Sequence, residues 1–258
     1  MAGPAIRVER RGGVVWCTLD RPPLNLFEPG LIAGLRATFE TLAADPTVRL
    51  AVVTGAGRAF TGGMNVRVLH DLDAAGATAL ITSLHDAIEA VHKAPFPVIA
   101  AVNGHALGAG FELAIACDLR IAAAEATFGL PEVRVGVPSV IQAALLPPLI
   151  GPARAAELLL TGQTIGAGQA LAWGLVNRVV ERTDLDAAVE SVVGAITACA
   201  PGAVRLQKQL IVRWRESDLP SAVRAGIAAF AAAYATGEPR EGAAAFLEKR
   251  APRFEDPR

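Results

Sequence analysis

Two segments of this sequence share one design, in which an apolar run leads into a glycine-rich turn and then into a helix start. The first is "AVVTGAGRAFTGGMNV" (51–66), and the second is "VIAAVNGHALGAGFELA" (98–114). Short apolar runs bounded by glycine predict buried strands, as does the β-branched run at 14–19. Apolar residues at helical spacing predict helices at 31–45 and 77–95. Strands that alternate with helices predict an α/β fold with helices packed on sheets.

The last quarter of the chain has a different character. After residue 185 it is rich in alanine, with apolar residues at helical spacing and no strand signal. We therefore predict a core at 1–195 and a C-terminal helical segment at 196–258. No low-complexity linker separates the two parts, so we expect the helices to pack on their own core or on a partner subunit.

The composition limits the classes of partner. The chain has 258 residues, is 52% hydrophobic and carries a formal net charge of −1. This charge gives no reason to expect nucleic acid or a membrane surface as a partner. No apolar run approaches the roughly eighteen residues of a membrane span, and the first residues lack the apolar core of a signal peptide. We expect a cytoplasmic protein. Cys17, Cys117 and Cys199 lack metal-ligand spacing, and we expect free buried thiols.

The glycine turns indicate a type of chemistry. Glycine allows backbone N–H groups to face a ligand, and the first N–H groups of a helix have no intrahelical partner. Two such turns could donate to one developing oxyanion, although for each turn alone a tight connection is the more common explanation. Neither turn has the pattern of a phosphate-binding loop or of the dinucleotide fingerprint, and the chain has no G-x-S-x-G elbow.

Two glutamates stand in apolar surroundings close to these turns. Glu112 lies in the first turn of a predicted helix, and Glu132 follows a proline further along. Burial would raise the pKa of such a carboxyl and suit it to proton transfer, while helix capping is the simpler alternative for each. For Asp118 and Arg120 we expect a structural ion pair or a cap. His85, His92 and His105 lack the companions of a metal site, and we expect no metal.

Several long motifs resemble the enoyl-CoA hydratase/isomerase family, the crotonases. They are "RPPLNLF", "VVTGAGRAFTGGMNV", "PVIAAVNGHALGAGFELAIACDLRIAAAEATFGLPEVRVG", "LLLTGQTIGAGQALAWGLVNRVV" and "REGAAAFLEKRAPRF". The resemblance covers nearly the whole chain. It implies an α/β spiral of ββα units with a C-terminal helical segment that mediates homotrimers, often paired as hexamers.

The resemblance also implies roles for individual residues. The backbone N–H groups of Met64 and Ala109 would hold the carbonyl of an acyl-CoA thioester as an oxyanion hole. Glu112 would act as base on a water that attacks Cβ, and Glu132 would protonate Cα. Both glutamates together imply hydration of a trans-2-enoyl-CoA to a 3-hydroxyacyl-CoA. No cofactor is implied, because coenzyme A is part of the substrate.

Further positions would contact the substrate or its CoA part. They are Leu24, Arg58, Asn65, Val66, Arg67 and Gly110, together with Phe230, Phe246 and Lys249, which reach a neighbouring subunit's site in relatives. Arg58 and Lys249 suit the CoA phosphates, with an ordinary surface cation as the alternative.

This chain departs from the family pattern at two places. Asn65 stands where an aspartate is usual. The turn after Glu132, "GVPSVIQAALLPP", is one residue shorter than usual and has Ser139 and Val140 in place of a glycine pair. These changes keep other reactions open: double-bond isomerisation, a dehalogenase-like reaction, thioester hydrolysis, or CoA binding without catalysis.

Overall fold

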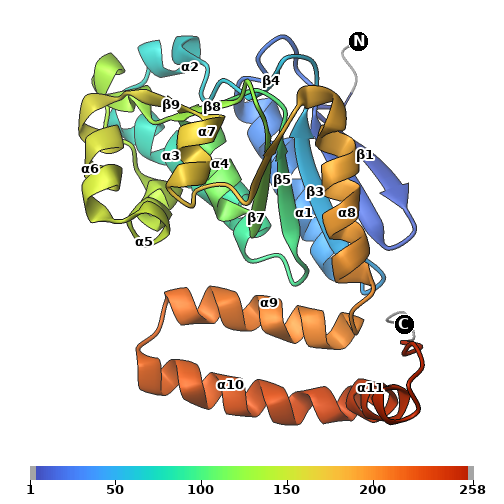
Figure 1. Cartoon of the computed structure of the whole chain (residues 1–258). Helices are drawn as coiled ribbons and strands as arrows, with labels where there is room; N and C mark the ends of the chain where they lie inside the picture. The colour runs from blue at the N-terminus through green and yellow to red at the C-terminus, as the bar shows by residue number, and fades with distance from the viewer. Residues whose placement is uncertain (1–3, 255–258) are drawn as a thin grey trace.

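Two β-sheets organise the chain in the computed structural model, which describes residues 4–254 (Figure 1). The larger sheet has the order β1-β2-β3-β5-β7-β10 and is parallel except for the β1–β2 pair. The smaller sheet has the order β4-β6-β8-β9 and is parallel except for β8–β9. The larger sheet consists of β1 (Ile6–Arg11), β2 (Val14–Leu19), β3 (Leu50–Gly55), β5 (Val98–Val102), β7 (Leu119–Ala123) and β10 (Arg178–Val180). The smaller sheet consists of β4 (Ala59–Thr61), β6 (His105–Leu107), β8 (Thr127–Gly129) and β9 (Thr164–Gly166).

Successive strand pairs divide between the two sheets. In β3–β4, β5–β6 and β7–β8, the first strand joins the larger sheet and the second joins the smaller one. Helical segments follow each pair: α2 (Val66–His70) and α3 (Ala74–His92), then α4 (Ala109–Ala116), then the short 3-10 turns η1 (Pro131–Val135) and η2 (Ile141–Leu145). This arrangement confirms the predicted spiral of ββα units.

Helices cover both faces of the larger sheet. The remaining helical elements are α1 (Pro29–Ala44), α5 (Leu146–Ile150), α6 (Pro152–Thr161), α7 (Ala167–Ala172), η3 (Arg182–Asp184), α8 (Leu185–Thr197), α9 (Pro201–Arg215), α10 (Leu219–Ala233), η4 (Tyr234–Thr236) and α11 (Glu238–Leu247). Ala51 and Val53 of β3 belong to the core beneath α1, α3 and α4, whereas Leu50 and Val52 pack in a separate cluster with α8. This alternation explains why the strands read as continuous apolar runs.

Most of the helices and strands predicted from the sequence are present in the structure, but the sequence did not predict its shortest strands. β2 has the predicted bounds, and α1 lies close to the predicted helix at 31–45. The strands of the smaller sheet are only three residues long and lie inside or beside glycine turns. Segments this short contain too few residues for a period of two to be recognised.

The C-terminal helices α9, α10 and α11 lie below the ends of the strands in the view of Figure 1, with α9 nearer to the sheets than α10. α8 packs on the larger sheet through Leu185, Val189 and Val193, and α9 begins after a break at 198–200. The division into a core at 1–195 and a helical segment at 196–258 stays a prediction. Within residues 4–254, no single helix is long and apolar enough to cross a membrane. One pair of helical segments bent by 107°, Arg182–Thr197 with Pro201–Arg215, meets the length and composition criteria jointly.

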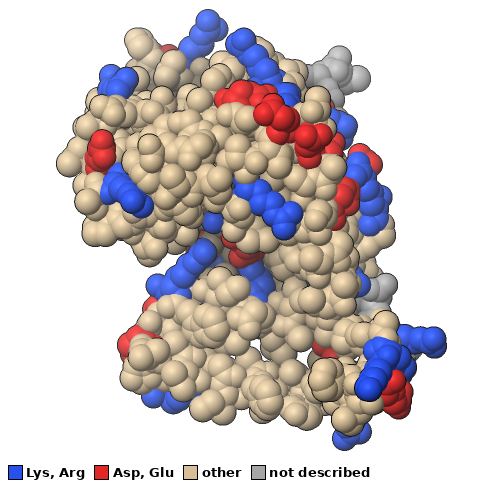
Figure 2. All heavy atoms as spheres, viewed as in Figure 1, with Lys and Arg blue, Asp and Glu red and all other residues tan. Residues whose placement is uncertain are grey.

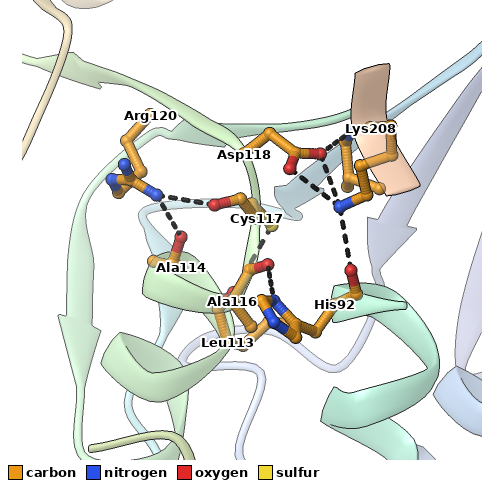
Figure 3. A network of polar contacts seen from close by, with 9 residues as sticks. His92, Leu113, Ala114, Ala116, Cys117, Asp118, Arg120 and Lys208 are labelled. Atoms are coloured by element: carbon orange, nitrogen blue, oxygen red, sulfur yellow. Dashed lines mark hydrogen bonds and ion pairs between the residues drawn. The ribbon is translucent and has the colours of Figure 1, made fainter. Parts of the chain in front are cut away.

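A buried polar network joins α9 to the ends of α3 and α4 (Figure 3). The Nζ of Lys208 donates to both carboxylate oxygens of Asp118, at 2.7 and 2.9 Å, and to the carbonyl of His92. Arg120 instead donates to the carbonyls of Ala114 and Cys117 at the end of α4. The expected structural roles are confirmed, since Asp118 forms an ion pair and Arg120 caps a helix, but the ion-pair partner of Asp118 is Lys208 and not Arg120.

The three cysteines are free, as predicted, but they differ in exposure. Cys17 and Cys117 are buried, whereas Cys199 is exposed. The expectation that all three thiols are buried is wrong for Cys199, because this residue lies in the short break after α8, where no element covers it. Burial raises the pKa of both Cys17 and Cys117 to about 12, which keeps these thiols protonated and unreactive.

Candidate active site

One cavity brings together residues from both glycine turns and both glutamates. Its volume is about 300 Å³. Met64, Ala109, Glu112 and Glu132 all line it, so four positions from separate parts of the sequence meet around one space. The rest of the lining is mostly apolar and consists of Leu69, Leu72, Ala77, Thr78, Leu80, Ile81, Leu84, Val137, Pro138, Ser139 and Val140.

The two glycine turns lie against each other at this cavity. Gly63 has a φ of +88°, and a Cβ there would be 2.5 Å from the carbonyl oxygen of Leu107. Only glycine allows this approach, which brings the residue before Met64 next to the residue before Gly108. Within residues 4–254, neither the Met64 N–H nor the Ala109 N–H has a hydrogen-bond partner. Two unpaired amides beside one cavity form a suitable pair of donors for an oxyanion.

The first turn of α4 carries Glu112 into a dry environment. Every residue of α4 is buried, and Glu112 itself is only 3% exposed. Burial, together with the charge of Glu132, raises the pKa of Glu112 to about 8. The backbone N–H of Ala143 donates to Oε1 of Glu112 at 3.3 Å, and Val140 supplies a second backbone hydrogen bond. A carboxyl group held in this way can exchange a proton near neutral pH.

Glu132 lines the same cavity but belongs to a different segment of the chain, η1. It lies in the first turn of η1, which follows β8 and begins at Pro131. The hydroxyl of Ser139 donates to Oε2 of Glu132 at 2.6 Å. A Cβ on Gly108 would be 2.4 Å from Oε1 of Glu132, so the missing side chain at Gly108 makes room for this carboxylate.

The unusual turn after Glu132 becomes part of the site. Val137, Pro138, Ser139 and Val140 line the cavity. The same turn provides the hydroxyl that contacts Glu132 and, from Val140, a backbone donor to Glu112. The shorter turn thus leaves both glutamates facing one cavity.

Four of the positions expected near the CoA part, Leu24, Arg58, Asn65 and Gly110, lie in or against the first glycine turn. The carbonyl of Leu24 accepts from the Gly62 N–H at 2.8 Å, which ties this loop to the first glycine turn. Arg58 is exposed, and Gly110 is packed against Thr61. Asn65 caps α2 by accepting from the Arg67 N–H at 3.1 Å, a role that aspartate performs equally well.

Val66 and Arg67 lie outside the main cavity. Both border a separate surface hollow with His70 and Asp71. Phe230 and Phe246 are 70% and 83% exposed on α10 and α11, and Lys249 follows α11 with a φ of +54°. Within one chain these three residues line no part of the cavity, and their contact with a neighbouring subunit's site stays a prediction.

Sequence reasoning missed the apolar wall that α2 and α3 provide. Leu69 and Leu72 lie in and just after α2, and Leu80, Ile81 and Leu84 project from α3. The periodicity of 77–95 predicts the helix but gives no sign of the cavity, because a side chain that lines an apolar pocket looks like one in a core. The histidines lie elsewhere: His92 contacts the carbonyl of Ala116, and His105 contacts Thr127.

Several known proteins are similar to this chain in fold and sequence over nearly its whole length. The family model "Enoyl-CoA hydratase/isomerase" matches residues 9–257. A crotonyl-CoA hydratase of Syntrophomonas wolfei is 37% identical, over 98% of this chain and 99% of its own length. A probable enoyl-CoA hydratase of Mycobacterium bovis is 38% identical over the same shares. The crystal structure of an enoyl-CoA hydratase from Mycobacterium smegmatis has a TM-score of 0.94 at 34% identity, covering 98% and 99% of the two chains. The chain therefore belongs to the enoyl-CoA hydratase/isomerase family.

Proposed function

We propose that this protein is an enoyl-CoA hydratase, which adds water across the double bond of a trans-2-enoyl-CoA to give a 3-hydroxyacyl-CoA. The observation that carries the proposal is the meeting of Glu112 and Glu132 in one apolar cavity beside two unpaired backbone amides. Hydration needs one group to take a proton from water and another to give a proton to carbon. Two carboxyl groups facing the same space meet that need.

The thioester oxygen would lie between the N–H groups of Met64 and Ala109. Negative charge develops on this oxygen when a nucleophile attacks Cβ, and donors already in place stabilise it without reorganisation. The N-terminus of α4 adds positive potential at the same point. The acyl chain would occupy the apolar wall formed by Leu80, Ile81 and Leu84.

The two carboxyl groups would work as one unit. Because the pKa of Glu112 is raised to about 8, this carboxyl holds a proton near pH 7 in the free enzyme. A water between the carboxyl groups passes that proton to Glu132 and leaves Glu112 as the base. The water oxygen then bonds to Cβ as Glu112 takes one of its protons, and the electrons of the double bond move to the thioester oxygen. Glu132 gives its proton to Cα, which completes the addition.

The test is an assay with crotonyl-CoA in which the product mass and the loss of enoyl-thioester absorbance are both followed. We expect a gain of one water, and a decrease in kcat of about 10²–10⁴-fold for Glu112→Gln and for Glu132→Gln. A product of unchanged mass would instead indicate isomerisation, and free CoA would indicate thioester hydrolysis. Full activity of Glu132→Gln would exclude the mechanism.

For the CoA part of the substrate we propose the loops around Leu24, Arg58 and Asn65 to Arg67. Arg58 is exposed beside the first glycine turn and can reach a phosphate. We also propose that no separate cofactor takes part and that the protein is cytoplasmic. Activity that survives dialysis against a chelator would support the first point.

We propose that the C-terminal helices assemble the protein as a homotrimer or a hexamer. Leu219, Val223, Ile227 and Phe230 are 76%, 52%, 67% and 70% exposed and lie at helical spacing along α10. Few charged side chains cover the middle of α10 in the view of Figure 2. A second copy that covers this face would also bring Phe230, Phe246 and Lys249 towards a neighbouring site. Light scattering on the purified protein measures the copy number directly.

A further inference from the structure

Ser139 holds one defined oxygen of Glu132. Its hydroxyl donates a short hydrogen bond to Oε2 at 2.6 Å. The turn between the two residues is fixed by the Val137 N–H, which donates to the carbonyl of Glu132 at 3.2 Å, and by Gly136 with a φ of +86°. The backbone of this turn therefore holds the Ser139 hydroxyl close to the Glu132 carboxylate.

The other oxygen of Glu132 has a different environment. Oε1 lies so close to Gly108 that a Cβ there would be only 2.4 Å away. The next residue is Ala109, whose N–H is one of the two proposed oxyanion donors. Oε1 thus faces the place where a thioester carbonyl and its Cα would lie, while Oε2 is occupied by the hydroxyl of Ser139.

We infer that Ser139 is a positioning residue that reserves Oε1 of Glu132 for proton transfer to the substrate Cα. This inference rests on the proposed function, since it assigns the oxygen that completes hydration. In the forward direction the O–H bond at Oε1 breaks, a C–H bond forms at Cα from the enolate electrons, and Glu132 is left as a carboxylate. In the reverse direction Oε1 takes the Cα proton, and the electron pair returns to the thioester oxygen.

The support around Glu132 explains why such a residue is needed. η1 has no buried residue, and residues 133–138 are all exposed. Apolar packing therefore does little to fix the rotamer of Glu132. Within the described residues, Ser139 is the only side chain with a hydrogen bond to this carboxylate. Without the hydroxyl, the carboxyl group could rotate and present either oxygen, or neither, to Cα.

The experiment compares Ser139→Ala, Ser139→Thr and a control, Ser83→Ala. Ser83 also donates a short hydrogen bond, to the carbonyl of Leu80 at 2.7 Å, but it does not line the cavity. Two rates are measured: hydration of crotonyl-CoA, and exchange of the Cα protons of saturated butyryl-CoA in D₂O, followed by NMR. Exchange needs only proton transfer at Cα and the oxyanion donors, not the addition of water.

We expect Ser139→Ala to lower kcat for hydration and the exchange rate together by about 10- to 100-fold, with little change in KM. Ser139→Thr keeps a hydroxyl and should recover most of both rates, whereas Ser83→Ala should match the wild type. Thermal melting of each variant checks that the fold is intact. If Ser139→Ala exchanges Cα protons at the wild-type rate, or if Ser139→Thr fails to recover, the inference is wrong.

The exchange assay also separates this inference from the proposed function. Wild-type protein that exchanges Cα protons but adds no water to any enoyl-CoA would contradict the hydratase assignment. The exchange rates of the Ser139 variants would still decide the role of Ser139 in that case.

Discussion

The two glutamates of the site are supported in opposite ways. Glu112 lies on α4, where all eight residues from Ala109 to Ala116 are buried. Glu132 lies on η1, a five-residue 3-10 turn without a buried residue, and the chain stays exposed up to Pro138. One carboxyl group is held by a packed helix, and the other is held by a surface turn.

The two glutamates are therefore held in position by different kinds of contact. The buried segment can fix the oxyanion donor of Ala109 and the carboxyl of Glu112 relative to each other, because close packing leaves no alternative rotamer. The exposed turn must hold Glu132 by polar contacts such as that of Ser139. It also forms a wall of the cavity beside solvent, where a substrate and a product can pass.

The largest loss of stability is expected from removing the ion pair beside the C-terminal end of α4. Lys208 is 2% exposed and pairs at 2.7 Å with Asp118, which directly follows α4 and its C-terminal cap. Lys208→Met would leave the Asp118 carboxylate, which is 12% exposed, without its cation. We expect the free energy of unfolding to fall by about 3–5 kcal/mol in urea denaturation.

A second lysine provides the control for this change. Lys93 also pairs at 2.7 Å, with Glu89, but its side chain is 52% exposed. Lys93→Met should cost less than about 1 kcal/mol, since water screens the pair. Equal losses for the two variants would show that the buried pair does not anchor α4.

The next prediction concerns the close contact between Gly108 and the carboxylate of Glu132. Gly108→Ala would place a Cβ 2.4 Å from Oε1 of Glu132, at a residue with a φ of +54°. We expect kcat/KM with crotonyl-CoA to fall about 10²-fold, the cost of displacing a reacting group by about 1 Å. Gly174→Ala is the control, because Gly174 also has a positive φ, +77°, but open space around it. Similar losses of activity in both variants would attribute the effect to backbone strain alone.

A pH-dependent effect tests the difference in burial between the two glutamates. In the unfolded chain Glu112 titrates near its ordinary value of 4.5, and in the folded chain its pKa is about 8. Between these values only the folded state keeps the proton, so the free energy of unfolding falls as pH rises through this window. One such group contributes a slope of about 1.4 kcal/mol per pH unit. Urea denaturation from pH 5 to pH 8 should show Glu112→Gln gaining stability relative to the wild type; parallel curves would contradict the raised pKa.

Much of the fold could be predicted because local signals were strong. The apolar strands at β2, β3 and β5 stand between glycine turns, and the helix period of α3 is clear in the sequence. Two turns of the same design suggested that two backbone N–H groups could donate to one oxyanion, and the resemblance to a known family assigned these donors to Met64 and Ala109. The resemblance to a known family then placed Glu112 and Glu132 at one site.

Other features left no local signal. Asp118 pairs with Lys208, which is far away in the sequence, and nothing near Asp118 distinguishes that partner from Arg120. The contact between Ser139 and Glu132 depends on the path of one turn, which a shortened sequence motif does not reveal. In each case the side chains are ordinary, and their meeting is a product of the tertiary fold.

In the proposed mechanism Glu112 and Glu132 act as one unit on a single water. The most direct test is the kcat for crotonyl-CoA hydration of wild type, Glu112→Gln, Glu132→Gln and the double variant. Groups that act together have strongly non-additive effects. We predict that the double variant is about as slow as the slower single variant. A double variant whose loss equals the product of the two single losses would show that the glutamates act independently and would contradict the account.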